Sequence, residues 1–253
     1  MNRLKFYFEH SLIGYFCRRA REKWFTEPPP PPPPPPARLD YFGITLQLDC
    51  LPQEMQKVLL SGGYEAPEIK ILPALLSPSD RVLEIGAAIG FLGLFCRKII
   101  KVSQFFSVEP NPTTLAYLRR NYELNKIEPV VIEAALAAAD GPLSLSTTDM
   151  FWTDSVVSGA VATTSKQITV RGLSFKSILE IAGINFNAMI IDVEGGEQFL
   201  PIALIPREIK KILIEIHPEM IGVRPAYSVL EALIGAGFQV QNHNHNTWAL
   251  TRS

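Results

Sequence analysis

The chain has 253 residues, enough for one α/β domain with an additional N-terminal segment. A hydrophobic content of 47% and a charged content of 19% suit a globular protein with a buried sheet, and a formal net charge of −1 gives no reason to expect a nucleic-acid partner. The three cysteines lie far apart without C-x-x-C spacing, which argues against a disulfide framework and a zinc site and indicates a reducing, cytoplasmic compartment.

The N-terminal region differs in composition from the rest of the chain. Six basic residues and only two acidic ones lie in the first 25 positions, among seven aromatic side chains. We expect residues 1–27 to form a basic, aromatic helix that packs on its own domain or makes peripheral contact with an anionic membrane surface. The prolines Pro28–Pro36 predict a polyproline II spacer of about 28 Å, at roughly 3.1 Å per residue. Residues 37–253 then form the main domain.

The main domain begins with short elements. Residues 41–51 alternate loosely between apolar and polar side chains and predict one or two strands. Residues 53–61 predict a helix that ends at the glycine pair after them, and a second helix begins near Pro67 and ends before Pro78.

The stretch over residues 81–96 is the most informative in the chain. An apolar strand is followed by a turn of small residues and an apolar helix, which is the first half of a βαβ unit. A dinucleotide-binding fingerprint does not fit, because Ala88 and Phe91 occupy positions where that pattern requires glycine.

A different pattern, E-x-G-x-G-x-G, fits this turn better. Glu84, Gly86 and Gly90 match it, and Ala88 stands in place of the middle glycine. At these residues the chain resembles class I S-adenosylmethionine (SAM)-dependent methyltransferases. A glycine turn before a helix N-terminus suits the carboxylate of the amino-acid tail of SAM.

A second acid follows at the end of the next predicted strand, residues 104–108. Glu109 lies 25 residues after Glu84. The carboxyl ends of successive parallel strands meet at one sheet edge, where an acid is placed to accept hydrogen bonds from the ribose hydroxyls of a nucleoside. The alternative is that Glu109 caps the helix predicted near residues 113–125.

The middle of the chain departs from this βα rhythm. Strands are predicted over residues 129–134, 143–147 and 167–171. The serine- and threonine-rich loop 147–166 between the last two is long for a compact domain. It is therefore a lid, a substrate-reading segment or a disordered connection.

A cluster of acids follows the strand predicted over residues 188–191. Asp192, Glu194 and Glu197 stand within six residues, which is unfavourable unless the carboxylates are solvated, paired or used in chemistry. The next predicted strand, residues 211–216, carries an acid near its end and a histidine after it, Glu215 and His217. Helices over 174–182 and 229–236 and a closing hairpin over 238–251 complete the predicted elements.

Taken together, these motifs resemble the FkbM-type methyltransferases over about residues 62–251. The stretches that carry the resemblance are Gly63-Tyr64-Glu65, Val82–Gly90, Val108–Asn111, Asp140-Gly141, Ile191–Glu197 and Ile214–His217. The resemblance implies an α/β fold: a doubly wound, mostly parallel, seven-stranded Rossmann-like sheet with a C-terminal antiparallel hairpin. It also implies a SAM-dependent O-methyltransferase that acts on a hydroxyl of a sugar, glycan or polyketide-like acceptor.

The resemblance further implies roles for individual residues. Asp192 would lie at the tip of the fourth strand, near the transferring methyl group. The methionine end of SAM would contact Glu84, Gly86, Ala88 and Gly90. The ribose would be held by Glu109, and the adenosine would lie beside Asn111.

An alcohol acceptor is a poor nucleophile and needs a base within hydrogen-bond reach. Its position at a strand tip favours Asp192 as this base, with His217 as the second candidate. No metal site is predicted, because spacing alone does not bring side chains together; Asp192, Glu194, Glu197 and Glu215 would suit an oxygen-binding cation if they converged.

Two other functions fit the same fold. The domain could bind SAM or a related nucleoside without transferring methyl, as a scaffold. An NAD-dependent or nucleotide-sugar enzyme would need a phosphate-binding turn, against which Ala88 and Phe91 argue.

Overall fold

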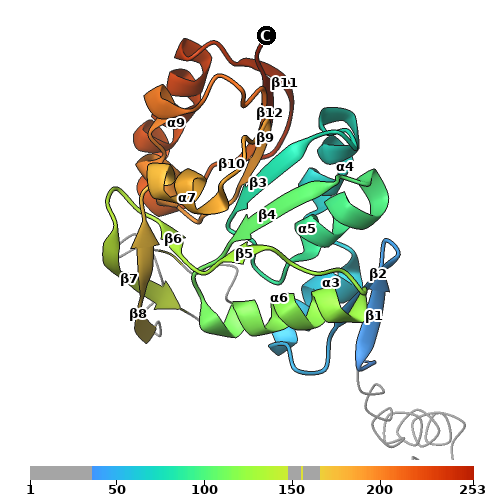
Figure 1. The fold of residues 1–253 in the computed structure, drawn as a ribbon. Coiled ribbons are helices and arrows are strands. Elements are labelled where there is room, and N and C mark those ends of the chain that lie inside the picture. Colours follow the sequence, from blue (N-terminus) through green and yellow to red (C-terminus); the bar gives the residue numbers. More distant parts are fainter. Residues whose placement is uncertain (1–35, 148–154, 156–165) are drawn as a thin grey trace, which may run out of the picture. The chain divides into compact units, whose positions relative to one another are not determined.

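The computed structural model describes residues 36–147, 155 and 166–253, and its central feature is a seven-stranded sheet (Figure 1). In spatial order the strands are β11 (Gln239–Asn244), β12 (Thr247–Thr251), β10 (Lys211–Glu215), β9 (Ala188–Ile191), β3 (Arg81–Ile85), β4 (Gln104–Val108) and β5 (Val131–Ile132). The run from β10 to β5 is parallel, and β12 is antiparallel to both of its neighbours. The predicted doubly wound sheet with a C-terminal antiparallel hairpin is confirmed.

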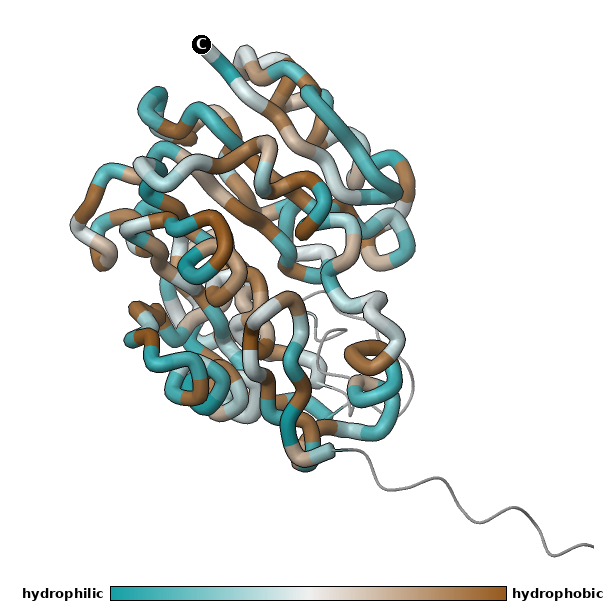
Figure 2. The backbone as a smooth tube through the Cα atoms, turned by 90° about the vertical axis from the view of Figure 1, so that its right-hand side faces the viewer, coloured by the Kyte–Doolittle hydropathy of each residue, from teal (hydrophilic) through white to brown (hydrophobic). Residues whose placement is uncertain are grey.

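Both faces of this sheet are covered, because its central strands are apolar on both sides. Successive residues point to opposite faces, so Val82 packs in one hydrophobic cluster and Leu83 in the other. The first cluster includes residues of β1 (Arg38–Tyr41), β2 (Ile44–Gln47), α3 (Gln53–Ser61), α4 (Ala66–Leu75), α5 (Phe91–Phe95) and α6 (Pro112–Leu124). The second includes residues of α7 (Phe175–Ala182) and α9 (Val223–Gly235). Figure 2 shows the hydrophobic segments running through the interior strands.

A smaller three-stranded sheet lies beside the carboxyl ends of the large one (Figure 1). Its strands are β6 (Ala135–Leu136), β8 (Lys166–Leu173) and β7 (Gly141–Thr147). This sheet explains why strands and helices stop alternating in the middle of the chain. After β5 the chain leaves the large sheet, and β6 and β7 pair with β8 instead.

Several element boundaries differ from the predicted ones. The strand expected over 129–134 is only Val131–Ile132. The helix after the glycine turn continues beyond α5 as a π-helical turn, η1 (Cys96–Ile100), and Lys101 closes it with a left-handed backbone. The last helix begins at Val223 rather than 229, and β11 extends to Asn244, so the closing hairpin turns at residues 245–246.

Three predictions fall outside the described residues: the helix over 1–27, the proline spacer up to Pro35 and nearly all of the loop 147–166. Membrane contact by the N-terminal region therefore stays a prediction. Within the part of the chain that the structure describes, no helix is both long enough and apolar enough to cross a bilayer.

Candidate active site

The glycine turn lies between β3 and α5 and is held against the end of β9. Gly86 has a φ of +89°, and a Cβ at this position would lie only 1.5 Å from the carbonyl oxygen of Asp192. The amide of Gly86 donates to Val108 O at 2.9 Å, and the amide of Asp192 donates to Ile85 O at 2.9 Å. The carboxyl ends of β3, β4 and β9 are thereby joined at one edge, where the backbone approaches too closely for any side chain.

The alanine that replaces the middle glycine adopts a glycine-like conformation. Ala88 has a φ of +43°, which L-residues rarely adopt. Gly90 follows with a φ of +79° and precedes α5; a Cβ there would lie 2.8 Å from both Leu118 and Tyr122 of α6. The turn thus keeps the backbone of the predicted motif, although the alanine methyl adds strain on the order of 1 kcal/mol.

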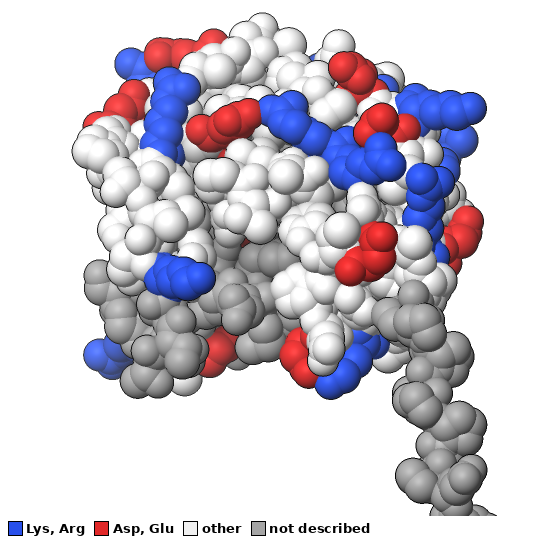
Figure 3. All heavy atoms as spheres, turned by 90° about the horizontal axis from the view of Figure 1, so that it is seen from below, with Lys and Arg blue, Asp and Glu red and all other residues white. Residues whose placement is uncertain are grey.

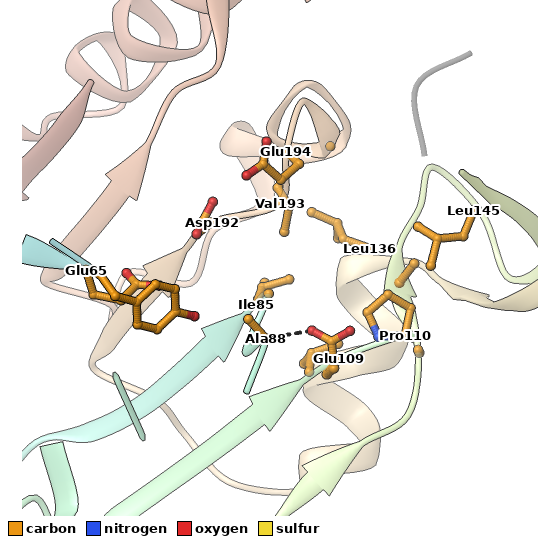
Figure 4. Close-up of a pocket in the computed structure, with 16 residues that line it drawn as sticks. Glu65, Ile85, Ala88, Glu109, Pro110, Leu136, Leu145, Asp192, Val193 and Glu194 are labelled. Carbon is orange, nitrogen blue, oxygen red and sulfur yellow. Dashed lines mark hydrogen bonds between the residues drawn. The ribbon is translucent and has the colours of Figure 1, made fainter. Parts of the chain in front are cut away.

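Glu109 connects this turn to the next one. Its Oε2 accepts a hydrogen bond from the amide of Ala88 at 2.9 Å, and its Oε1 accepts one from the amide of Asn111 at 2.9 Å (Figure 4). Asn111 itself is the N-cap of α6, since its side chain accepts from the amide of Thr113 at 2.8 Å. The capping role considered for Glu109 therefore belongs to Asn111, and Glu109 stays at the strand end.

A pocket opens above these strand ends. Its empty space, open mouth included, is about 680 Å³. Apolar side chains and a few acids line it: Tyr64, Glu65, Ile85, Gly86, Ala88, Val108, Glu109, Pro110, Ala134, Ala135, Leu136, Leu145, Asp192, Val193, Glu194 and Gly196. Figure 4 shows Glu109 beside Ala88 at one side of the pocket and Asp192 with Glu194 at another.

This lining fits the chemistry of SAM. The walls near β4 and β6 are apolar and suit a flat base, with Val108, Leu136 and Leu145 among them. Glu109 adds a carboxylate to this lining, and Gly86 and Ala88 add backbone without long side chains.

Of the predicted cofactor residues, Gly86, Ala88 and Glu109 line this pocket, whereas Glu84, Gly90 and Asn111 do not. Glu84 lies within the sheet with 1% of its surface exposed and accepts a hydrogen bond from Ser107 at 2.7 Å. Burial, with smaller contributions from the charges of Glu109 and Asp192, raises the pKa of Glu84 to about 8. The structure therefore places Glu84 within the sheet and outside the lining of this pocket.

A second pocket adjoins the first and is strongly acidic. Both pockets are lined by Tyr64, Glu65, Asp192 and Glu194. The second is also lined by Val58, Gly63, Pro67, Glu68 and Glu215. Five carboxyl groups therefore surround a space that opens beside the first pocket.

His217 lies behind these carboxyl groups. Its Nε2 is 3.5 Å from Asp192 Oδ1, 3.5 Å from Glu194 Oε2 and 3.9 Å from Glu215 Oε1. On its other side, Glu197 Oε1 accepts a hydrogen bond from the backbone amide of His217 at 2.8 Å and lies 3.6 Å from Nδ1. The side chain of His217 is 4% exposed and lines neither pocket.

The protonation of the cluster follows from burial and mutual repulsion. Burial raises the pKa of Asp192 to about 6, an effect that His217 opposes, and raises that of Glu194 to about 9 with help from the charge of Asp192. Burial alone would lower the pKa of His217, but Glu197 and the other carboxylates raise it to about 10. Burial also raises the pKa of Glu215 to about 8.

The pockets separate the two predicted catalytic residues. Asp192 lines both pockets, where its carboxylate could accept a proton. His217 lines neither pocket and lies 3.5 Å from Asp192, and the surrounding carboxylates raise its pKa, so its position suits orienting Asp192.

The sequence missed part of the lining. Glu65 and Glu68 come from the start of α4, and Leu136 and Leu145 come from the small sheet. No sequence pattern links these elements to the strand tips, and only the resemblance quoted above included Tyr64 and Glu65. Burial and the charges of Glu68 and Asp192 hold the pKa of Glu65 well above its ordinary value.

Comparison with known families gives one clear match. The family model described as the TRM5/TYW2 methyltransferase domain matches residues 42–172, which is 131 of the 253 residues. A comparison with curated proteins gives no match.

Similar solved structures are distant in sequence. M. jannaschii TYW2 in complex with AdoMet is 16% identical, with a TM-score of 0.44, over 84% of this chain and 82% of that one. The precorrin-6y C5,15-methyltransferase of Geobacter metallireducens is 14% identical, with a TM-score of 0.44, over 70% and 82%. The methyltransferase FkbM of Methylobacillus flagellatus is 14% identical, with a TM-score of 0.41. The alignment covers 70% of this chain and only 44% of that protein.

Proposed function

Because the chain belongs to the TRM5/TYW2 methyltransferase domain family, and SAM is its cofactor, we propose that it transfers the methyl group of SAM to a hydroxyl oxygen. SAM supplies an electrophilic methyl group on its sulfonium. We place the reaction in the cytoplasm, as the cysteine usage suggests.

The observation that carries this proposal is the meeting of the two pockets at Asp192. The first pocket has an apolar lining with one carboxylate at Glu109, which suits SAM, and the second opens beside it with Asp192 and Glu194 shared between them. An acceptor in the second pocket would present its hydroxyl to Asp192. A base at that point suits an alcohol, whose proton must be taken up as the new C–O bond forms.

The remaining residues support this arrangement. Glu109 would hold the ribose and so fix the cofactor along the strand ends. His217 holds the carboxylate of Asp192 in place from behind, at 3.5 Å. The apolar walls of the first pocket exclude water from the methyl group, which favours transfer to the acceptor over loss to solvent.

For the acceptor we propose a neutral, hydroxyl-rich molecule such as a sugar, glycan or polyketide-like compound, as the FkbM-type motif Asp192–Glu197 suggests. Family membership supports tRNA as a second candidate acceptor. Among the described residues that line the second pocket there is no lysine or arginine that could receive a phosphate group. On the face drawn in Figure 3, basic and acidic side chains are interspersed, without a broad basic area.

The test is transfer of label from methyl-tritiated SAM into sugars, glycans, polyketides and tRNA in parallel. Asp192→Asn should reduce transfer by about 100-fold or more, while calorimetry should show SAM affinity within about threefold of the wild type, because the amide keeps the size of the side chain. Asp49→Asn, the same change at an exposed residue, is the matched control.

Each result has a clear meaning. Label in tRNA alone would replace the proposed acceptor with the second candidate. SAM binding without transfer to any acceptor would favour the scaffold function, and full activity of Asp192→Asn would refute the role of Asp192 as the base.

A further inference from the structure

We infer that Asp192, Glu194, Glu215 and His217 form a binding site for one divalent metal ion between the two pockets. Asp192, Glu194 and His217 each offer a ligand atom, and these three atoms lie within 4.8 Å of one another. The oxygens of Asp192 and Glu194 are both 3.5 Å from His217 Nε2, and that of Glu215 is 3.9 Å from it. Ligand atoms bound about 2.1 Å from a single ion are typically separated by roughly 3–4 Å, so small side-chain movements would complete the site.

A second observation, the lack of partners for buried polar atoms, also points to a ligand. The His217 side chain is 4% exposed and its Nδ1 has no hydrogen-bond partner among the described residues, while its Nε2 lies 3.5 Å from an oxygen of Asp192 and 3.5 Å from one of Glu194. Asp192 Oδ1 is likewise buried without a hydrogen-bond partner among them. Buried polar atoms nearly always have partners, and a metal ion between Asp192 and His217 Nε2 would give Asp192 Oδ1 the partner that it lacks.

The surrounding charge favours a cation. Within the ranges that the structure describes, no lysine or arginine pairs with Asp192, Glu194 or Glu215, and His217 is their one basic neighbour. Glu65 and Glu68 add two further carboxyl groups at the edge of the second pocket. A divalent ion would stabilise the ionised form of the carboxyl groups that bind it, which burial otherwise makes unfavourable.

The donor set also indicates which ion. Carboxylate oxygens alone would suit Mg²⁺ or Ca²⁺, whereas an added imidazole nitrogen favours transition ions such as Mn²⁺ or Zn²⁺. Glu197 would orient His217 from the side away from the ion. Its Oε1 lies 3.6 Å from His217 Nδ1 and accepts a hydrogen bond from the backbone amide of His217. Metal-bound histidines typically pair their second nitrogen with a carboxylate in this way.

The position of the site suggests what the ion would do. Asp192 and Glu194 line both pockets, so an ion held by them would face the cofactor and the acceptor together. An acceptor oxygen could then be a further ligand. This role rests on the proposed methyl transfer, but binding of the ion does not.

The test uses Mn²⁺ and the full-length protein, without SAM. Free Mn²⁺ gives a six-line electron paramagnetic resonance signal that is lost on binding, so titration yields stoichiometry and affinity. We expect one ion per wild-type chain and at least tenfold weaker binding by Glu194→Gln and by His217→Gln. Glu219→Gln removes the same charge at an exposed position nearby and should bind within twofold of the wild type.

Glu194→Gln is the decisive variant, because its partly exposed side chain can be changed with less risk to folding than that of His217; circular dichroism checks both. Absence of binding to folded wild type at millimolar Mn²⁺, or equal binding by wild type and folded Glu194→Gln, would overturn the metal site. The affinity for SAM is measured by calorimetry on the same samples, as a test of the proposed function that is independent of Mn²⁺ binding. Loss of SAM binding with retained Mn²⁺ binding would count against the proposed function and leave the metal site standing.

Discussion

Replacing the buried Glu84 by glutamine should change how stability depends on pH. The carboxyl group lies inside the sheet, 1% exposed, and burial raises its pKa from the ordinary value of 4.5 to about 8. In the unfolded chain the group ionises near 4.5, whereas in the folded protein it stays protonated until about pH 8. The folded state therefore loses stability as pH rises through this interval, and the loss is complete above pH 8.

The size of the effect follows from the same values. Each pH unit between the two pKa values contributes about 1.4 kcal/mol, so the roughly three and a half units give about 5 kcal/mol in total. Glu84→Gln removes the titration, and its amide oxygen can still accept the hydrogen bond from Ser107. The variant should gain about 3 kcal/mol relative to wild type between pH 5.5 and pH 7.5.

The measurement is urea-induced unfolding at half-unit pH steps from 5 to 8.5, with EDTA present so that metal binding does not contribute. Glu128→Gln, the same substitution at an exposed residue, controls for the loss of one formal charge. A stability difference between wild type and Glu84→Gln that stays constant across this range would refute the reasoning, because it would mean that burial does not shift this ionisation.

Three further substitutions test the site and its support. Gly86→Ala should abolish SAM binding and lower the free energy of unfolding by about 3 kcal/mol. The new Cβ would lie 1.5 Å from the carbonyl oxygen of Asp192, and the φ of +89° is unfavourable for alanine. An unchanged melting temperature would contradict this. Glu109→Ala should weaken SAM binding about 10- to 100-fold in calorimetry through lost charge-assisted hydrogen bonds, and affinity equal to wild type would exclude the ribose role. Asp80→Ala should cost about 2–4 kcal/mol in urea unfolding, since it leaves Lys211 without its carboxylate at 2.7 Å; a loss below about 1 kcal/mol would show that the pair is unimportant.

The sequence alone determined the features that depend on neighbouring residues. The apolar run before Gly86 and the small residues after it specify a strand, a tight turn and a helix because backbone conformation responds to side-chain size over a few positions. The same local logic placed Glu109 and Asp192 at strand ends, and parallel pairing of β3, β4 and β9 then brought them to one edge.

Only the tertiary structure decided which of these side chains line the pockets. Glu84 and Asn111 both belong to the predicted motifs. The pleat of β3 turns Glu84 into the sheet, where it accepts a hydrogen bond from Ser107, and the side chain of Asn111 caps the N-terminus of α6. Conversely, Glu65 reaches the acids of β9 and β10 across more than a hundred residues of sequence. Ionisation is likewise decided by burial and by such distant neighbours, so the raised pKa values of Asp192 and His217 could not be predicted from local spacing.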